Sequence, residues 1–144
     1  MFVMNIALAA DHAGYHLKEE IKKHLINQGH SVEDVGTDSE ESVDYPDYGR
    51  KAAQLVSEGK AQRAILVCGT GIGMSMVANK VEGVRAANCN DFKSALLSRR
   101  HNDANILSLG SRMIDKESAI EIVDGWLSEE FEGGRHERRV KKIV

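Results

Sequence analysis

The sequence has few cysteines, a single proline, few aromatic residues and no excess of basic charge. Two cysteines in 144 residues are too few for a disulfide framework, so a disulfide-dense secreted fold is excluded. The net charge of −3 argues against a general binder of nucleic acids or of anionic membranes. No apolar run approaches the ~18 residues that a membrane span needs. These absences predict a cytoplasmic protein with free thiols.

An apolar segment occupies residues 1–10. It has no basic residues ahead of it and runs directly into Asp11 and His12. Because a secretory signal peptide needs a basic start before its apolar core, we expect a buried strand here instead.

Short apolar runs alternate with longer amphipathic stretches along the chain. The short runs predict strands at residues 5–10, 31–35, 64–68, 84–88 and 105–109. The longer stretches predict helices at residues 15–28, 48–57, 73–80, 92–100 and 117–131. This regular alternation predicts one α/β domain over residues 1–144, with a five-stranded parallel sheet covered by helices on both faces.

Basic residues gather in the C-terminal segment, residues 132–144. Its last ten residues contain five Lys or Arg against one Glu, and we expect them to form a short appended helix. Arg135 and Arg139 are four apart and share one face of that helix. The pair suits a phosphate dianion, or else it is a solvated helix end that favours cations. Docking of this helix on a partner subunit would give the pair a function.

Two loops carry most of the chemically reactive residues. In an open parallel sheet, ligands bind beyond the carboxyl ends of the strands, where the strand order reverses. With an assumed order of 2-1-3-4-5, this crevice lies between the first and third strands. The loops that border it are residues 11–14 and 68–73.

Gly69, Gly71 and Gly73 directly follow the third strand and open a helix. Glycines at such a position let backbone amides converge on an anion. Their spacing matches neither the dinucleotide fingerprint nor the P-loop. The same glycines are also compatible with tight packing of the helix on the strand, without any ligand.

Cys68 lies where the third strand ends and this helix begins. A helix N-terminus stabilises a thiolate, so we expect the pKa of Cys68 to be lowered toward neutrality. A base beside amide donors suits enolisation, in which a proton next to a carbonyl is removed and the enediolate is stabilised. The alternative is an inert core cysteine, which is our interpretation of Cys89.

The histidines near the first strand have two interpretations. Asp11 and His12 follow this strand, where they could do acid–base work or, together with His16, ligate a metal. We favour acid–base work, because no second cluster of ligands converges on them. His24 and His30 are interpreted as surface or boundary residues.

His101, Asn102 and Asp103 precede the fifth strand, so they lie at the amino edge of the sheet, opposite the crevice. His101 therefore either caps the preceding helix or reaches the crevice of a neighbouring subunit across a twofold axis. The second option predicts an active site made by two chains.

Together these segments resemble the ribose-5-phosphate isomerase B family, which includes the galactose-6-phosphate isomerase subunits. The resemblance runs nearly end to end and depends on several separated motifs in the same order. The motifs are residues 10–14 (ADHAG), 44–46 (DYP), 68–73 (CGTGIG), 78–80 (ANK), 83–86 (GVRA), 101–103 (HND), 110–112 (GSR) and 133–136 (GGRH).

This resemblance implies a Rossmann-like α/β/α sandwich and a homodimer, or dimer of dimers, with active sites shared between subunits. It implies reversible conversion of D-ribose 5-phosphate to D-ribulose 5-phosphate in the pentose phosphate pathway. Neither a metal nor an organic cofactor is expected, and neither nucleic acid nor a membrane is an expected partner.

The resemblance also implies roles for individual residues. Cys68 is the base that moves the proton between C2 and C1. The backbone amides from Gly69 through Gly71, Ile72 and Gly73, with Thr70, hold the enediolate. The other implied roles are ring opening by His101 and Asp11, phosphate binding by His12, Arg135 and Arg139, and sugar contacts by Asn102, Arg112 and Tyr45.

Several alternatives stay open. Some family members lack the cysteine and use a glutamate at the position of Met74, so the base here should be Cys68. One type of galactose-6-phosphate isomerase subunit also lacks the cysteine, and Cys68 argues against that type only. A 6-phosphohexose such as allose or galactose 6-phosphate is an alternative substrate. A non-catalytic sugar-phosphate sensor would leave Cys68 without a role, and a thiol redox protein would lack a resolving cysteine.

Overall fold

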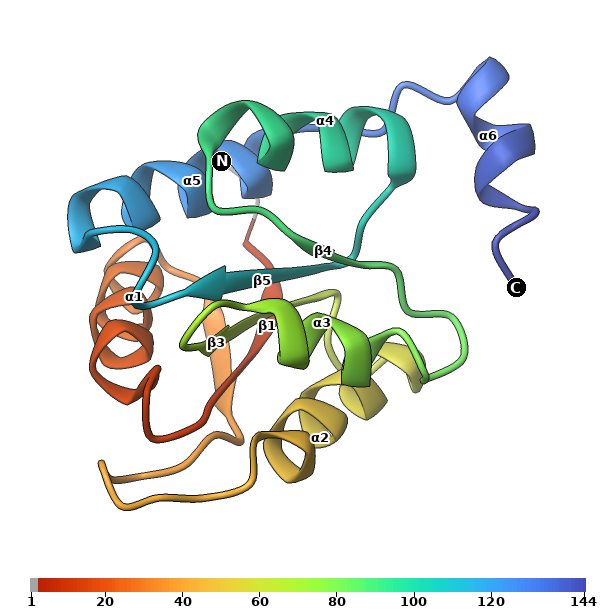
Figure 1. Cartoon of the computed structure of the whole chain (residues 1–144). Helices are drawn as coiled ribbons and strands as arrows, with labels where there is room; N and C mark the ends of the chain where they lie inside the picture. The colour runs from red at the N-terminus through yellow and green to blue at the C-terminus, as the bar shows by residue number, and fades with distance from the viewer. Residues whose placement is uncertain (1–2) are drawn as a thin grey trace.

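The computed structural model describes residues 3–144, so the first two residues of the apolar N-terminal segment lie outside it. The strands are β1 (Asn5–Ala10), β2 (Ser31–Asp34), β3 (Arg63–Cys68), β4 (Ala86–Asn88) and β5 (Ile106–Gly110). They form one parallel sheet (Figure 1). The helices are α1 (Tyr15–Asn27), α2 (Tyr45–Ser57), α3 (Ile72–Ala78), α4 (Phe92–Asn102), α5 (Lys116–Ser128) and α6 (Arg135–Val140). The predicted three-layer α/β fold with a five-stranded parallel sheet is confirmed.

The strand order assumed from the sequence is wrong for the last two strands. The observed order is β2-β1-β3-β5-β4. All five residues of β5 are buried, so this strand belongs inside the sheet, whereas β4 has three residues, none of them buried, and lies at the edge. The reversal at β1 and β3 is unaffected, because β2 and β3 pair with opposite sides of β1.

Helices cover both faces of the sheet, and each strand alternates its side chains between two cores. Ile65 and Val67 of β3 pack in the core that α1, α4 and α5 cover. Leu66 and Cys68 pack in the core that α2 and α3 cover. The alternation follows from the two-residue repeat of a strand. It places the Cys68 side chain on the α2 and α3 face.

Some helix boundaries differ from the expected ones. α2 begins at Tyr45 rather than residue 48, because Pro46 fits the first turn, where an amide has no helical partner. α5 ends at Ser128 rather than residue 131, because the backbone at Glu129 is extended. The C-terminal helix ends at Val140 rather than residue 144. Within residues 3–144, no helix is both long and apolar enough to cross a lipid bilayer.

A buried lysine ties α1 to the end of β2. The side chain of Lys18 is 2% exposed, and its Nζ lies 2.6 Å from Asp34 Oδ2 and 2.6 Å from Glu19 Oε2. Burial alone would lower the pKa of Lys18, but the hydrogen bonds and charges of these carboxylates outweigh it and raise the pKa. Burial likewise opposes the charge of Asp34, yet its hydrogen bonds to Lys18, Gly36 and Lys22 lower the pKa of that carboxyl.

Replacing Lys18 with methionine should lower the free energy of unfolding by about 3 kcal/mol, because Asp34 loses its buried partner. Because the pKa of Asp34 is lowered in the folded protein, this carboxyl stabilises the fold at pH values above 3.8. That stability is lost as the pH falls through the pKa of Asp34 in the folded protein. Because the pKa of Lys18 is raised in the folded protein, this ammonium stabilises the fold at pH values below 10.5. That stability is lost as the pH rises through the pKa of Lys18 in the folded protein. Urea unfolding at neutral and acid pH measures the Asp34 contribution, and unfolding at alkaline pH measures that of Lys18. The difference between wild type and Lys18→Met should shrink on acidification.

Lys22→Met is the matched control. Its Nζ lies 3.1 Å from the same Asp34 oxygen, but its side chain is 35% exposed. We therefore expect a loss of at most about 1 kcal/mol. Equal losses for the two variants would contradict a special contribution from the buried lysine.

Candidate active site

Three loops meet at the carboxyl edge of the sheet. The loop after β1 approaches β3 so closely that a Cβ on Gly14 would lie 2.3 Å from the carbonyl oxygen of Val67, so only glycine fits there. The loop after β5 joins them, since the Ser111 hydroxyl donates to the carbonyl of Ala13 at 2.8 Å. The two loops that border the predicted crevice are thus side by side, and the loop after β5 is a third component.

Cys68 is the last residue of β3, and only 6% of its surface is exposed. The backbone amide of Gly71 donates to its Sγ at 3.2 Å. A hydrogen bond from an amide is stronger to a charged acceptor than to a neutral one. The residue predicted to be a base therefore has an amide donor directed at its sulfur.

The second cysteine has a different environment. Cys89 packs in the core with Ala95 and Leu107. Burial raises the pKa of the Cys89 thiol. This environment supports its interpretation as a core residue and makes Cys89 a natural internal control for Cys68.

The glycines of the loop after β3 are required by close contacts. Gly71 has a left-handed backbone with φ of 85°, and a Cβ there would lie 2.4 Å from Asn88 Oδ1. A Cβ on Gly73 would lie 2.6 Å from the ring of Tyr45. The Thr70 hydroxyl oxygen accepts from the amide of Ile72 at 3.1 Å. Close packing thus accounts for two of the glycines, and it is compatible with anion binding by the same loop.

Two side chains expected around the sugar lie against this loop. The ring of Tyr45, at the start of α2, packs against Gly73. Arg112 packs against Gly69, where an added Cβ would lie 3.0 Å from Nη1. Arg112 also lines a cleft of about 810 Å³ beside the loops after β1 and β5. Both residues are therefore next to the loop that follows Cys68.

Asp11 and His12 hold loops in place as well as lining the edge. Asp11 is 7% exposed, and its Oδ1 accepts from the amides of Ala13 and Gly14, each at 3.0 Å. His12 Nδ1 accepts from the amide of Val43 at 3.1 Å. Since Nδ1 is an acceptor, a neutral His12 carries its proton on Nε2, where it can donate to an anion.

The alternative metal set of Asp11, His12 and His16 does not gather in one place. His16 is exposed and pairs with Glu40, while the other two residues bind backbone amides. In the described part of the chain, these three residues do not form a convergent ligand group.

The other predicted site residues lie at the opposite edge. Ile106 of β5 pairs with Ala64 near the start of β3, whereas Cys68 pairs with Gly110. His101 and Asn102 end α4, ahead of this pairing, so they lie at the amino edge. This placement agrees with the prediction that His101 is remote from the crevice of its own chain.

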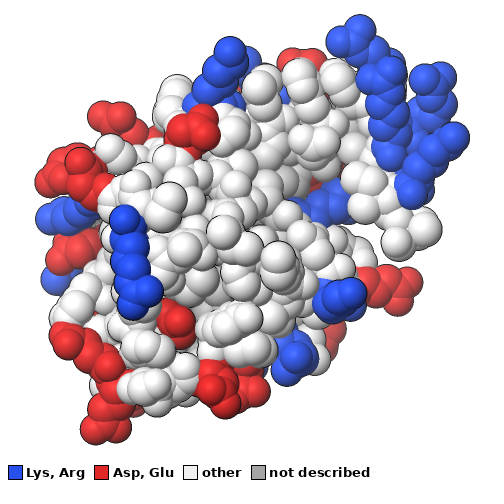
Figure 2. Space-filling view, viewed as in Figure 1, with Lys and Arg blue, Asp and Glu red and all other residues white. Residues whose placement is uncertain are grey.

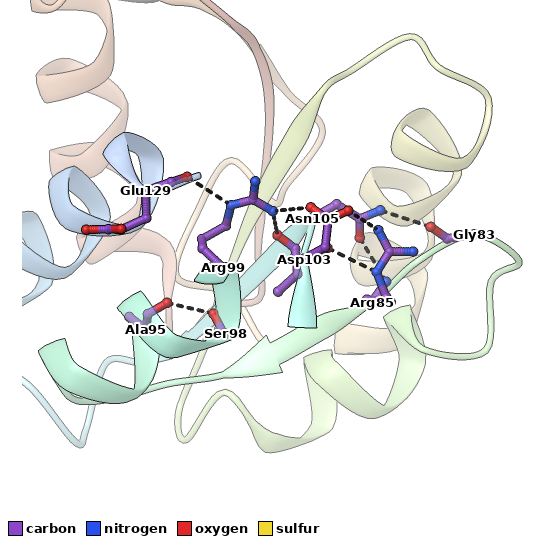
Figure 3. A network of polar contacts seen from close by, with 9 residues as sticks. Gly83, Arg85, Ala95, Ser98, Arg99, Asp103, Asn105 and Glu129 are labelled. Carbon is purple, nitrogen blue, oxygen red and sulfur yellow. Dashed lines mark hydrogen bonds and ion pairs between the residues drawn. The ribbon is translucent and has the colours of Figure 1, made fainter. Parts of the chain in front are cut away.

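The turn between α4 and β5 is fixed by a polar network (Figure 3). Asp103 is the helix cap, in a left-handed conformation with φ of 48°. Its carboxylate accepts from Arg99 Nη1 at 2.8 Å and pairs with Arg85 Nη2 at 3.4 Å. Asn105 ties Arg85 to the same turn by accepting from its amide at 2.8 Å. The capping role considered for His101 therefore belongs to Asp103.

His101 instead packs against the C-terminal segment. Its ring stacks on that of His136, with centroids 4.2 Å apart and planes 12° from parallel. Glu132 Oε1 lies 3.7 Å from His101 Nε2 and 3.6 Å from His136 Nε2. Burial, followed by the nearby His101 and Arg135, lowers the pKa of His136. These three residues lie close enough to ligate a metal, but parallel rings direct their nitrogen lone pairs side by side rather than at one ion.

Sequence reasoning missed His136 as a neighbour of His101. No local pattern signalled this contact, because the two residues come from different segments of the chain. The arginines of the same segment are exposed, and they form the basic projection at upper right in Figure 2 over α6. Arg135 and Arg139 are exposed on α6, which Figure 1 shows projecting beyond the end of α4.

Comparison with known proteins identifies the family of this chain. The family model described as Ribose/Galactose Isomerase matches residues 6–143. The chain belongs to this family. Within the family, ribose-5-phosphate isomerase B of Escherichia coli strain K12 is 49% identical, over 96% of this chain and 93% of that protein.

Solved structures of similar proteins share the fold. Ribose-5-phosphate isomerase B of Clostridium thermocellum has a TM-score of 0.96 and 53% identity, covering 97% of this chain and 95% of that one. The Mycoplasma genitalium ribose-5-phosphate isomerase B, solved with bound ribulose-5-phosphate, has a TM-score of 0.94 and 44% identity, covering 97% and 93%. The family resemblance expected from the motifs is confirmed.

Proposed function

We propose that this chain is an aldose–ketose isomerase that interconverts D-ribose 5-phosphate and D-ribulose 5-phosphate in the pentose phosphate pathway. The observation that carries the proposal is the Gly71 amide directed at Cys68 Sγ, in a chain of the ribose/galactose isomerase family. A thiolate beside a loop of amides suits proton removal next to a carbonyl. The ribulose-5-phosphate bound to a relative supports the choice of sugar.

The proposed reaction begins with the open-chain aldose. The Cys68 thiolate removes the proton from C2, the C–H electron pair forms the C1–C2 double bond, and the C1 carbonyl oxygen takes up the charge. The amides of residues 69–73, with Thr70, stabilise this enediolate. O1 then gains a proton, O2 gives up its proton as the C2 carbonyl forms, and the thiol returns its proton to C1. Atoms and electrons balance, so the reaction consumes no oxidant or reductant.

The proposed site needs two chains. Cys68 and His101 lie at opposite edges of one chain, so they can serve one substrate only when His101 comes from a second copy. We propose a homodimer, or a dimer of dimers, that works in the cytoplasm. In it, the basic segment of residues 132–144 docks beside the Cys68 edge of the other copy.

Ring opening and phosphate binding follow from this assembly. His101, with Asp11, would open the furanose ring, and Asn102 would contact the sugar beside Arg112 and Tyr45. The phosphate would lie between His12 of one chain and the Arg135 and Arg139 pair of the other. Guanidinium pairs and a neutral imidazole donor both suit a phosphate dianion.

A 6-phosphohexose is the second candidate substrate, because the family that matches the chain covers galactose as well as ribose isomerases. Side-by-side assays on ribose 5-phosphate, allose 6-phosphate and galactose 6-phosphate decide between them. We expect the highest kcat/KM on ribose 5-phosphate. A higher value on either hexose would overturn the choice of the pentose.

Solvent exchange separates an isomerase from a non-catalytic sugar-phosphate sensor. In D₂O, we expect deuterium at C1 of the ribulose 5-phosphate formed and at C2 of the ribose 5-phosphate recovered, as measured by NMR. A sensor would bind the same sugar phosphates and exchange no carbon-bound hydrogen. Binding of all three sugars with neither isomerisation nor exchange would reject the enzymatic function.

A further inference from the structure

Four consecutive backbone carbonyls in the catalytic loop, residues 68–71, accept hydrogen bonds from residues that lie in β5 or just after β4 and β5. Two of them are held by backbone amides: the Cys68 carbonyl accepts from Ser111 at 2.8 Å, and the Gly69 carbonyl accepts from Arg112 at 3.0 Å. The other two are held by side chains that have no role in the proposed reaction. These side chains are Asn90, which follows β4, and Ser108, which lies within β5.

Ser108 is a polar residue at a position where the sheet is otherwise apolar. It is 0% exposed, and its neighbours in β5 are Leu107 and Leu109. Its hydroxyl donates to the carbonyl of Gly71 at 2.6 Å, which also accepts from the backbone amide of Ser75 at 3.2 Å. A buried hydroxyl is costly unless it is hydrogen-bonded, so this position is specified by its contact with the loop.

Asn90 joins the loop to the end of β5. Its Nδ2 donates to the carbonyl of Thr70 at 3.0 Å, and its Oδ1 accepts from the amide of Gly110 at 2.7 Å. Both ends of the side-chain amide are therefore used. Asn90 therefore links the loop after β3 to the end of β5 by hydrogen bonds, although these segments are distant in sequence.

Holding a carbonyl also fixes the amide that shares its peptide plane, because the C=O and N–H of a trans peptide point in opposite directions. The Thr70 carbonyl shares its plane with the amide of Gly71, which donates to Cys68 Sγ. The Gly71 carbonyl shares its plane with the amide of Ile72, which faces the Thr70 hydroxyl. The two side chains thus bind the carbonyls of the same two peptides whose amides face the Cys68 thiol and the Thr70 hydroxyl.

We propose that Asn90 and Ser108 are positioning residues, which hold the catalytic loop so that its amides face Cys68 and the enediolate. This inference rests on the proposed function for its effect on turnover, but its effect on the thiol is independent of any substrate. Neither residue touches the reacting atoms, and both act through the backbone of the loop.

The test uses two substitutions that change few atoms. Asn90→Asp keeps the acceptor for the Gly110 amide but replaces the donor to Thr70 with a repelling oxygen, and Ser108→Ala removes one hydroxyl. Each should lower kcat on ribose 5-phosphate by about 10-fold with little change in KM, a smaller loss than that for deleting an oxyanion donor outright. In both, the pH profile of Cys68 alkylation by iodoacetamide, followed by peptide mass spectrometry, should move to higher pH.

Matched controls separate positioning from loss of stability. Asn79 bridges backbone groups in the same way, since it donates to the Ala86 carbonyl at 3.0 Å and accepts from the Ala86 amide at 2.8 Å. Ser98 is 5% exposed and donates to the Ala95 carbonyl at 2.7 Å. Asn79→Asp and Ser98→Ala should lower Tm as their counterparts do, but leave kcat and the Cys68 alkylation profile unchanged.

The outcomes are distinguishable. If Asn90→Asp does not fold, Ser108→Ala alone decides. Folded variants with the wild-type kcat and alkylation profile, or controls with equal effects on both, would overturn the positioning role. If the wild type isomerises none of the three sugar phosphates, the proposed function fails, yet a shifted alkylation profile confined to Asn90→Asp and Ser108→Ala would still support the inference.

Discussion

Cys68→Ala is expected to lower kcat on ribose 5-phosphate by about 10²–10⁴-fold, because the reaction loses its only proposed general base. The site has no substitute, since the neighbouring position that could hold a carboxylate in this family is Met74, which is 0% exposed. Cys68→Ser should be nearly as inactive, because a hydroxyl is a much weaker acid than a thiol and stays protonated. Steady-state assays of the purified variants measure both losses.

Cys89→Ala is the control for this experiment. Cys89 is as buried as Cys68, with 6% exposure each, but it has no glycine-rich loop and packs in the opposite core. We expect wild-type turnover and a comparable change in Tm. Near-wild-type activity in folded Cys68→Ala would remove this residue as the base and, with it, the mechanism.

Mixing two inactive variants should restore activity if each site combines two chains. Cys68→Ala chains keep an intact His101, and His101→Ala chains keep an intact Cys68, so a mixed dimer contains one complete site and one doubly damaged site. With random exchange in a twofold dimer, half of the dimers are mixed, and activity should return to about a quarter of the wild-type level. The measurement is turnover after equal amounts of the variants have been incubated together.

The control mixture is Cys68→Ala with Cys68→Ser, which damages the same half of every site and should restore nothing. Native mass spectrometry of isotopically labelled chains establishes that subunits have exchanged. Complete exchange without returning activity would show that Cys68 and His101 do not meet in one site. It would then leave the amino-edge residues without the catalytic role proposed for them.

The fold was predictable because most strands are short apolar runs bounded by turn residues, and this pattern is local. β2 is the exception, since Val32 is its one apolar residue. The order of β4 and β5 is not local, since it depends on which strand gains more by lying inside the sheet. The signal was present in composition: residues 106–109 read Ile-Leu-Ser-Leu, whereas residues 86–88 read Ala-Ala-Asn. Comparing the two would have placed β5 inside.

The candidate site was predictable where a candidate residue lies at the carboxyl end of its strand. Cys68 ends β3, Asp11 and His12 follow β1, and the parallel sheet brings their loops to one edge. Residues that support the loop from a neighbouring strand could not be recognised from local sequence, because Ser108 and the Gly71 carbonyl that it binds are 37 positions apart. The cap of α4 was missed because Asp103 takes a left-handed conformation, which only a weak preference of aspartate foretells.

The placement of β5 matters while the chain is being made. A nascent chain emerging from the ribosome exposes β1 to β4 before β5 exists, leaving a strand-wide gap between β3 and β4. Open strand edges of this kind are prone to pair with other chains. The gap closes only when residues 106–110 arrive, and the same strand brings Ser108, one of the partners of the loop after Cys68. A translation product that stops short of them would therefore be prone to aggregate and would lack a complete active-site loop.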